Sequence, residues 1–323
     1  MKYRQEKYAA YLTTKEREIH SKYERNARVL NETLMPSPDA LVSFAVEQSR
    51  RLWERVPADE DFLSVRLGIG EREFAVDIQS PNKGFVLEDD VLVDNAISLA
   101  NKYRKIVNVP IQISLIDNRV IGVVGDSISV ANTMITNIVA LHAHDEVKIA
   151  LIYNPKKSKD LKWAMDLPHV WSNDRKQRYV ATSKTEVQAM LSQIDEFITN
   201  REAQLSKEDK RIPHFVFLVM DESLVEDAPF RKHMVDAENK IGVSTIFFGK
   251  RFNSIPKECA AIIQKDKDVC GIYIKNENNN QFVRFDADVV LPAQLRQFAD
   301  AINNHCECDD CVKKTPSDFY VDM

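Results

Sequence analysis

The sequence predicts an α/β protein in which a mostly parallel sheet carries helices on both faces and an antiparallel meander along one edge. Apolar runs of strand length alternate with longer runs of helical periodicity from residue 111 to residue 248. Two of the strand runs end in polar signatures, a glycine-containing turn within residues 119–143 and a pair of carboxylates closing residues 214–222. Each signature alone is common in α/β folds. Together, about 90 residues apart, they favour a nucleotide-binding core.

The first signature has the layout of a phosphate-binding turn without its lysine. In a working loop of this type, backbone N–H groups and a helix N-terminus hold the phosphates, while a lysine reaches the β- and γ-phosphates. Here Ile128 takes the place of the lysine, and Asp126 adds a carboxylate that repels phosphate. We therefore expect a loop that has kept its shape and lost its chemistry. The candidate phosphate-site residues are Gly122, Gly125, Asp126, Ser127, Ile128 and Ser129.

The second signature has the form of a Walker B strand. The apolar run His214–Met220 leads directly into Asp221 and Glu222. At such a strand end, the aspartate holds Mg²⁺ and the glutamate polarises the attacking water. A parallel strand can also end in acidic residues that have no function, so these two candidates depend on their pairing with the glycine turn.

The other elements follow from periodicity and from helix-breaking residues. Pro36 and Pro38 end a first helix over residues 2–35. Apolar and polar residues alternate on both sides of Gly70-Glu71, which predicts a β-hairpin within residues 62–79. The other expected helices are 39–56, 91–106, 129–143, 184–205, 229–239 and 292–304. The other expected strands are 111–116, 120–124, 147–153, 178–181, 214–220, 243–248, 260–264, 270–274 and 281–286.

Composition excludes several classes of function. The 323 residues are 44% hydrophobic and 29% charged, enough for one large or two ordinary globular domains. No apolar run of membrane-spanning length and no secretory signal is visible. Five cysteines, three of them in one short segment, fit a reducing cytosolic compartment better than a disulfide framework. The net charge of −5 gives no general nucleic-acid footprint.

The N-terminal helix differs from the rest of the chain in charge. Residues 1–28 carry eight Lys or Arg against four Glu, a local charge of +4, which leaves −9 on the remainder. An apolar stripe of Ile19, Tyr23, Leu30 and Leu34 runs along this helix. The sequence leaves two explanations open: an amphipathic helix packed on its own domain, or a juxtamembrane stalk whose basic face meets anionic lipid.

The C-terminal cysteines form a candidate zinc site. Cys308-x-x-Cys311 has the spacing of half a zinc site, and Cys306 or His305 could complete the ligands. Because His305 and Cys306 are adjacent, their simultaneous ligation is awkward. Partial sites that bridge two chains, and a reduced cluster without metal, stay open beside a zinc site within one chain.

The stretch LWERVPADEDFLSVRLGIG, Leu52–Gly70, closely resembles a segment of the membrane-anchored secretion ATPases of type VII systems, the EssC/EccC proteins of the FtsK/SpoIIIE family. Further matches follow in the same order: residues 119–148 resemble that family's degenerate phosphate loop and next strand, and Phe247–Gln264 resembles its region after Walker B. Phe319–Met323 looks like the start of the linker to the next ATPase module. The resemblance covers nearly the whole chain and matches the cytosolic part between the transmembrane helices and the first ATPase module.

This resemblance implies a RecA-like, P-loop-NTPase-type fold with an N-terminal helical stalk and a β-hairpin. The implied domains are a juxtamembrane stalk (1–38), a helix plus β-hairpin subdomain (39–110), a degenerate FtsK/SpoIIIE-like ATPase domain (111–305) and a Cys-rich linker (306–323). Against an active loop of form G-x-x-G-x-G-K-S, Ser127 replaces the third glycine and Ile128 the lysine. Arg251 falls near a polar sensor position, although the glutamine expected there is absent.

The function that these observations favour is a degenerate ATPase-like module that couples the membrane-embedded part of a secretion motor to its downstream ATPase modules. It would need no cofactor, or would bind Mg-ATP weakly, and as an isolated piece it is not expected to be an enzyme, because the lost lysine costs orders of magnitude in rate. The implied partners are other modules of the same polypeptide, neighbouring copies in an oligomer and other type VII membrane components, on the cytoplasmic side of the cell membrane. The alternative is an active or weakly active ATPase in which Lys250 or Arg251 replaces the lysine. A nucleic-acid translocase is disfavoured by the acidic balance and by the lack of a basic, aromatic-lined groove.

Overall fold

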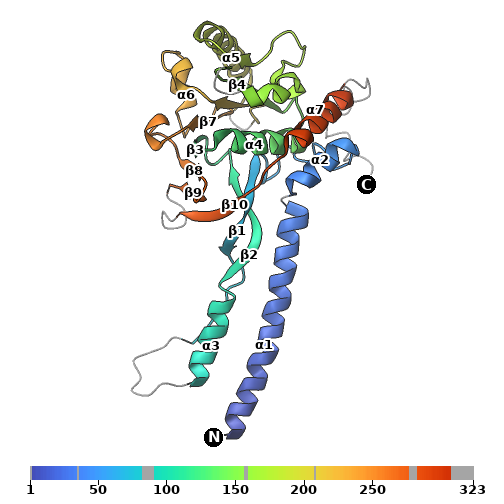
Figure 1. The fold of residues 1–323 in the computed structure, drawn as a ribbon, viewed down its shortest axis with the longest axis vertical. Coiled ribbons are helices and arrows are strands. Elements are labelled where there is room, and N and C mark those ends of the chain that lie inside the picture. The colour runs from blue at the N-terminus through green and yellow to red at the C-terminus, as the bar shows by residue number, and fades with distance from the viewer. Residues whose placement is uncertain are drawn as a thin grey trace. The chain divides into compact units, whose positions relative to one another are not determined.

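The computed structural model describes residues 2–34, 36–81, 91–155, 159–206, 209–275 and 282–306 (Figure 1). The chain forms two compact units, one of Met1–Pro36 with Ile69–Ile111 and one of Ser37–Gly68 with Gln112–Met323. The chain passes from one unit to the other within two strands, β1 (Ser64–Glu73) and β2 (Lys105–Ser114). No helix within the described residues is long and apolar enough to cross a membrane.

The described strands form a single sheet of order β2-β1-β10-β9-β8-β3-β7-β6-β4-β5. The run from β8 to β5 is parallel throughout, whereas β9 is antiparallel to both β8 and β10. This arrangement confirms the predicted mostly parallel sheet with an antiparallel edge. The strands of this part are β3 (Val120–Gly125), β4 (Val147–Ile152), β5 (Val180–Ala181), β6 (His214–Val219), β7 (Val243–Gly249), β8 (Ala261–Lys265), β9 (Cys270–Ile274) and β10 (Val283–Ala287).

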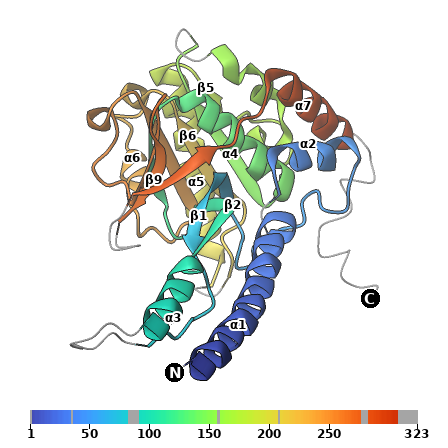
Figure 2. The same cartoon turned by 60° about the horizontal axis from the view of Figure 1, so that its bottom comes forward.

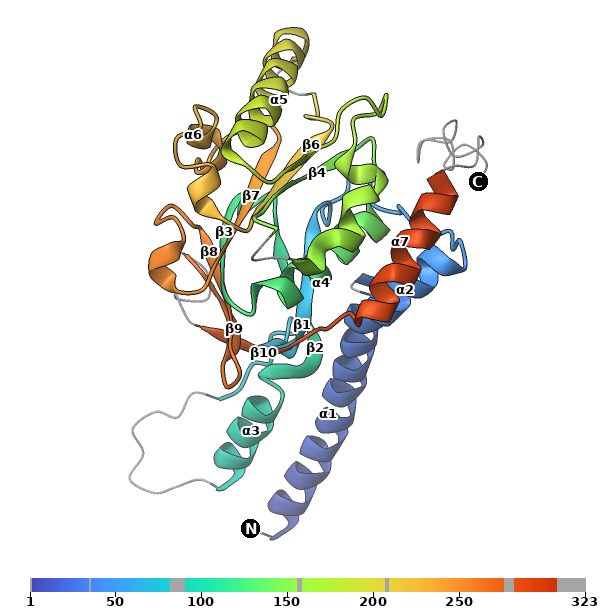
Figure 3. The same ribbon diagram turned by 45° about the horizontal axis from the view of Figure 1, so that its top comes forward.

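Helices lie on both sides of the parallel strands, as the sequence predicted. Figure 3 shows α5 (Lys184–Gln204) and α6 (Arg231–Met234) on one side, and α2 (Pro38–Val46), α4 (Ser127–Leu141) and α7 (Pro292–Cys306) on the other. Helices α2, α4 and α7 contact one another, and Figure 2 shows this group from a second direction.

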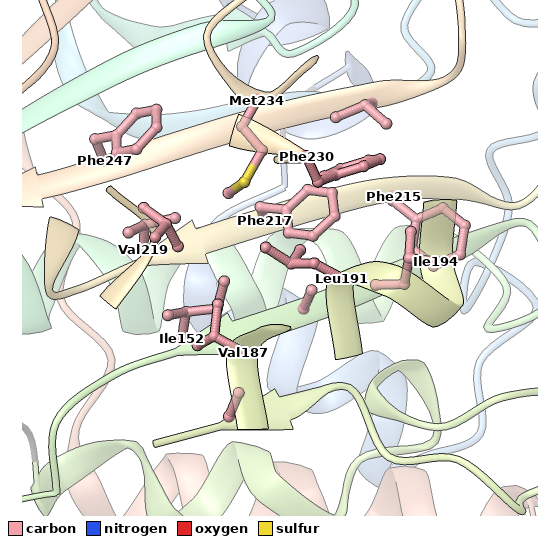
Figure 4. Close-up of a cluster of buried hydrophobic side chains, with 14 of the residues drawn as sticks. Ile152, Val187, Leu191, Ile194, Phe215, Phe217, Val219, Phe230, Met234 and Phe247 are labelled. Atoms are coloured by element: carbon pink, nitrogen blue, oxygen red, sulfur yellow. The ribbon is translucent and has the colours of Figure 1, made fainter. Parts of the chain in front are cut away.

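A buried cluster joins α5 and α6 to the sheet (Figure 4). Val187, Leu191, Ile194 and Ile198 recur at helical spacing on α5, so a single stripe of this helix faces the strands. Alternate residues of the strands meet that stripe, because successive side chains of a strand point to opposite faces of the sheet. The strand residues of this cluster include Val120, Val124, Ala150, Ile152, Phe215, Phe217, Val219, Val243 and Phe247.

In the first unit, α1 (Lys2–Arg28) continues as a π-helical turn, Val29–Leu34. From Ile19 onward its apolar stripe packs on a cluster of Phe74, Tyr103, Ile106 and Val109. Side chains of α1 and of the π-helical turn also satisfy the backbone of strand β2: the hydroxyl of Tyr23 accepts the N–H of Val107 at 3.0 Å, and the side-chain amide of Asn31, in the turn, donates to the carbonyl of Asn108 at 3.1 Å. Packing on its own unit, one of the two explanations left open, is therefore realised in this half of the helix, whereas a stalk role stays a prediction. The unit also contains helix α3 (Val91–Lys102), and the side chain of Leu34 lies outside the described residues.

The β-hairpin predicted at Gly70-Glu71 is wrong. Strand β1 runs through both residues and lies in the sheet between β10 and β2, and the strand that runs beside this stretch in place of a second hairpin arm is β2. Two backbone bonds mark the ends of the pairing: Leu115 N–H to the Leu63 carbonyl at 3.0 Å, and Phe74 N–H to the Arg104 carbonyl at 2.9 Å. Alternation on both sides of a glycine fits one long strand as well as two short ones, which is why the pattern misled.

The helix predicted over 39–56 is also too long, because α2 ends at Val46. The segment after it instead caps the C-terminus of α4. The Trp53 N–H donates to the Ala140 carbonyl at 2.8 Å, the Trp53 indole N–H to the Val139 carbonyl at 2.9 Å, and the Arg55 N–H to the Leu141 carbonyl at 3.0 Å. These are carbonyls that a helix end leaves without partners, so the Leu-Trp-Glu-Arg motif acts as a cap. The helix predicted over 229–239 is likewise reduced to α6, a single turn.

Candidate functional site

The two predicted signatures lie at the same edge of the sheet. Strands β3, β7 and β6 are parallel neighbours, so their C-terminal ends share one edge. Gly122 is level with Phe247, which is level with Val219. Because β7 lies between the other two strands, the glycine turn and the carboxylates are separated by two strand spacings, about 10 Å. Ligands of open α/β sheets bind at this kind of edge.

The glycine turn does not have the path of a phosphate-binding loop, so the expectation that it keeps this shape is wrong. Strand β3 continues through Gly125 and α4 begins at Ser127, which leaves Asp126 alone between them. Gly122 is inside the strand, paired with Phe247 on one side and Ile262 on the other. A phosphate cradle needs several consecutive loop residues to supply its backbone amides, and here the loop between β3 and α4 is one residue long.

Close packing explains both glycines without a phosphate. A Cβ on Gly122 would lie 2.4 Å from Cδ1 of Ile255 and 3.2 Å from Sγ of Cys259. Gly125 has φ of +101° and backs onto β8, where a Cβ would lie 2.1 Å from the carbonyl oxygen of Lys265. Glycine is needed at Gly125 both for its left-handed backbone and for the close approach of the neighbouring strand.

Asp126 and Lys265 close the turn from within the chain. The carboxylate of Asp126 caps α4 by accepting the N–H of Ser129 at 3.4 Å, and the Asp126 N–H donates to the Lys265 carbonyl at 2.7 Å. The Lys265 ammonium hydrogen-bonds the Ser129 hydroxyl and lies 3.6 Å from the Asp126 carboxylate. A carboxylate thus takes the place at the helix N-terminus where a phosphate would be favoured.

Sequence reasoning missed Lys265. It is 136 residues from Ser129, and only the register of β8 against β3, which sets Lys265 beside Gly125, brings it to the turn. The remaining predicted members, Ser127 and Ile128, are half-buried in the first turn of α4, where neither supplies a positive charge.

The Walker B-like carboxylates also have partners within the chain. Asp221 begins a short 3₁₀ turn, Glu222–Leu224, and accepts the Ser223 hydroxyl at 2.7 Å. Glu222 accepts from the guanidinium of Arg231 on α6 at 2.6 Å, and both side chains are 28% exposed. A glutamate that polarises an attacking water must be free to contact it, whereas this one is paired with an arginine. Nothing in the sequence pattern indicated Arg231.

Apolar side chains fill the space beside Glu222 and Gly122. Ile255 and Cys259 are both buried and belong to the cluster under α5 and α6. Burial, with smaller contributions from Glu258 and Glu222, raises the pKa of the Cys259 thiol to about 12. The thiol is therefore neutral at physiological pH and behaves as a small apolar group.

Arg251 lies at the same edge, two residues after the end of β7, and is exposed. Its backbone N–H donates to the Ser254 hydroxyl at 3.1 Å and starts the turn Phe252–Ser254. The structure thus brings Arg251, Lys250, Asp126 and Glu222 to one edge, but the charged partners within contact are Lys265 for Asp126 and Arg231 for Glu222.

The predicted zinc ligands are only partly covered by the structure. The His305 ring lies 5.0 Å from that of Trp53, Cys306 is buried at the end of α7, and Cys308 and Cys311 lie outside the described residues. Among the described residues, no group of three or more His, Cys, Asp or Glu side chains is arranged to hold a metal ion.

Comparison with known proteins gives the following similarities. No family model matches the chain. It is 28% identical over 299 residues to the ESX secretion system protein EccC of Geobacillus thermodenitrificans, covering 90% of this chain and 19% of that protein. It is 24% identical over 302 residues to the ESX secretion system protein YukB of Bacillus subtilis, covering 90% of this chain and 19% of that protein. It is 24% identical over 313 residues to the type VII secretion system protein EssC of Staphylococcus aureus, covering 93% of this chain and 20% of that protein.

The chain therefore spans about a fifth of the length of the curated relatives that it matches. Among solved structures, the chain is similar to EssC (ATPases 2 and 3) from Geobacillus thermodenitrificans, at 12% identity and a TM-score of 0.48, covering 82% of this chain and 52% of that chain. Another is Thermomonospora curvata EccC (ATPases 2 and 3) in complex with a signal sequence peptide, at 13% identity and a TM-score of 0.45, covering 78% of this chain and 49% of that chain.

Proposed function

We propose, from its similarity to the type VII secretion proteins EccC, YukB and EssC, that this chain is a degenerate ATPase-like module of a secretion motor. In this proposal the module couples a membrane-embedded part of a longer protein to downstream ATPase modules during protein export. The module keeps a nucleotide-binding type of fold without cycling through ATP.

The observation that carries the proposal is the closed turn at the start of α4. Asp126 occupies the helix N-terminus, and Lys265 is held by Ser129 beside it. The chain itself supplies the negative and positive charges that a phosphate and a loop lysine would bring. Loss of one preorganised charge contact at a transition state typically costs about 3 to 4 kcal/mol, or a hundredfold to a thousandfold in rate.

The residues present do not fit Mg-ATP as they stand. Ser129 and Asp221 would be the metal-side ligands, but the Ser129 hydroxyl is bonded to Lys265 and Asp221 accepts from Ser223. The single residue between β3 and α4 also leaves too little backbone to surround a triphosphate. In this proposal, therefore, any binding of Mg-ATP is weak, in the high micromolar to millimolar range at best.

The partners in this proposal are the other modules of the same polypeptide, neighbouring copies in an oligomer and other membrane components of the system. The module lies on the cytoplasmic side of the cell membrane, with its N-terminal helix as a juxtamembrane stalk. Its match to about a fifth of each relative supports the assignment to one module of a larger protein. The net charge of −5 argues against nucleic acid as a partner.

Calorimetric titration with Mg-ATP tests the proposal. A variant with Asp126→Ala, Ser127→Gly and Ile128→Lys restores the residue types of a phosphate loop, but β3 still runs through Gly125, and we expect no gain in affinity. A second variant carries the same changes and about four inserted glycine-rich residues after Gly125, and it should bind at least about tenfold more tightly than wild type. Lys250→Ala is the matched control at the same edge. Micromolar affinity of wild type for Mg-ATP, or a higher affinity in the first variant than in wild type, would contradict the proposal that the turn is closed to nucleotide.

A weakly active ATPase with a non-standard loop is the second candidate, and Lys265 is the observation that favours it. This lysine reaches Ser129 from a neighbouring strand, so it could act on a phosphate in place of the missing loop lysine. If so, wild type would turn over ATP, and the variant Lys265→Met would lose this activity and stay folded. If the module is a coupler, there is no turnover to abolish, and Lys265→Met alters stability alone.

A further inference from the structure

The first three turns of α1 carry an exposed surface that has no part in the candidate site at the edge of the sheet. Tyr3 and Tyr11 are 69% and 54% exposed, although tyrosine is an aromatic residue that folding usually covers. With Arg4, Lys7 and Tyr8 they line a shallow hollow on the helix surface. Their positions, spaced by three and four residues, place them on one side of the helix. We name these five residues the tyrosine-basic face.

The basic and aromatic groups of this face are arranged together. The Lys7 ammonium lies 4.6 Å from the ring centroid of Tyr3, and the Lys15 ammonium lies 5.8 Å from that of Tyr11. Both pairs are four residues apart, so they form within the helix and need no partner from elsewhere. The rings of Tyr8 and Tyr11 are 6.2 Å apart. The face therefore presents apolar rings, hydroxyls and positive charges over the same area.

The composition of this face differs from that of a helix that docks on another helix. The aliphatic residues of α1 that pack on its own unit begin at Ile19, whereas residues 3–11 contain no aliphatic side chain larger than those of Ala9 and Ala10. Helix-to-helix docking needs a stripe of large aliphatic residues. Tyrosine combined with lysine and arginine is instead typical of the interface between a bilayer and water, where rings sit at headgroup depth and ammonium groups meet lipid phosphates.

The charge distribution of the chain indicates that the partner surface is negatively charged. Residues 1–28 carry +4 and the remainder of the chain −9, so an anionic surface attracts the first segment and repels the rest. Against a nucleic acid as the anionic partner, the short face offers no extended basic groove along which a strand could lie. We propose that the tyrosine-basic face of α1 docks on an anionic phospholipid surface. This proposal does not depend on whether the turn at α4 binds nucleotide.

Co-sedimentation of the full chain with vesicles tests the proposal. At low ionic strength, the chain should bind vesicles of phosphatidylcholine with about one-third phosphatidylglycerol, and binding should fall steeply as salt is added. The double variant Arg4→Gln with Lys7→Gln should lower the partition coefficient by about 25-fold, on the basis of roughly fivefold per basic residue. Tyr3→Ser with Tyr11→Ser should also weaken binding, because it removes the rings and keeps the charge. Circular dichroism should be unchanged in both, since the replaced side chains are exposed.

The matched control is Lys210→Gln with Lys257→Gln, which removes the same charge from two exposed lysines elsewhere and should leave vesicle binding at the wild-type level. If vesicle binding fell as much in this control as in Arg4→Gln with Lys7→Gln, net charge and not the tyrosine-basic face would govern binding, and the proposal would be overturned. Equal binding to vesicles of phosphatidylcholine alone would also overturn it. Tighter binding to single-stranded nucleic acid than to the anionic vesicles, at equal ionic strength, would assign the face to that other polyanion and contradict the lipid proposal.

Discussion

Lowering the pH should destabilise the fold through His142, and the size of the effect can be worked from its surroundings. His142 is fully buried at the end of α4. Its Nε2 accepts the Leu63 N–H at 2.9 Å, so its Nδ1 is the protonated nitrogen and donates to the Ile138 carbonyl at 3.0 Å. A second proton, on Nε2, would point at the Leu63 N–H and break this hydrogen bond. Burial, and then the nearby Arg55, lower the pKa of His142 to about 3.

The sign and magnitude follow from proton linkage. The unfolded chain binds a proton at this histidine below about pH 6.5, whereas the folded chain does so only near pH 3, so stability falls as the pH drops between these values. Between about pH 7.5 and pH 5.0, His142 should contribute a loss of about 2 kcal/mol. His214, buried with a pKa of about 3, acts in the same direction, whereas Glu146, whose pKa burial raises to about 7, acts against it.

Urea unfolding followed by tryptophan fluorescence isolates the contribution of His142. For wild type and for His142→Gln, the free energy of unfolding is measured at both pH values, and the pH-dependent loss should be smaller in the variant by about 2 kcal/mol. The comparison cancels His214 and Glu146, which are present in both proteins. Val187→Ala creates a cavity in the buried cluster under α5 without touching the His142 ring, and as a control it should lower stability equally at both pH values. The same pH-dependent loss in wild type and His142→Gln would show that protonation of His142 does not cause it.

Three further outcomes are expected. Trp53→Phe removes the N–H that caps the Val139 carbonyl and should cost about 1 to 2 kcal/mol in urea unfolding, and a cost no larger than that of Trp171→Phe would mean that the cap is dispensable. Gly125→Ala should cost about 3 kcal/mol or more, because it forces a side chain into a left-handed backbone against β8, and a cost under about 1 kcal/mol would show that this turn relaxes freely. If Cys306, Cys308 and Cys311 with His305 hold zinc, elemental analysis of protein purified without chelator should find about one equivalent, and less than about a tenth would end that idea.

The central strands could be predicted because buried parallel strands are continuous apolar runs. Val120–Gly125, Val147–Ile152 and His214–Val219 have this form, and the structure confirms all three to within a residue or two. The long helix predicted over 184–205 is confirmed as Lys184–Gln204, and the side chain of Ser183 caps it by accepting the N–H of Glu186.

The errors came from contacts that local pattern does not contain. The strand containing Gly70 looked like a hairpin because its real neighbours are far along the chain: β2 lies beyond an intervening helix, and β10 is near the C-terminal end of the sheet-forming part. The turn at Asp126 looked like a phosphate loop because sequence spacing does not reveal that β3 extends through Gly125 between two neighbouring strands. Lys265 pairs with Asp126, and Arg231 pairs with Glu222. Strand register places Lys265 and a one-turn helix places Arg231, and neither arrangement can be read from the sequence.

A turnover assay of the purified chain with Mg-ATP tests whether this module is closed to ATP chemistry. We expect no phosphate release above background from wild type, and the same result from Glu222→Gln, because Glu222 is paired with Arg231 and the turn before α4 is closed by Asp126 and Lys265. Phosphate release by wild type that Glu222→Gln abolishes would contradict this expectation, since such a loss would require Glu222 to act on a water beside a bound nucleotide.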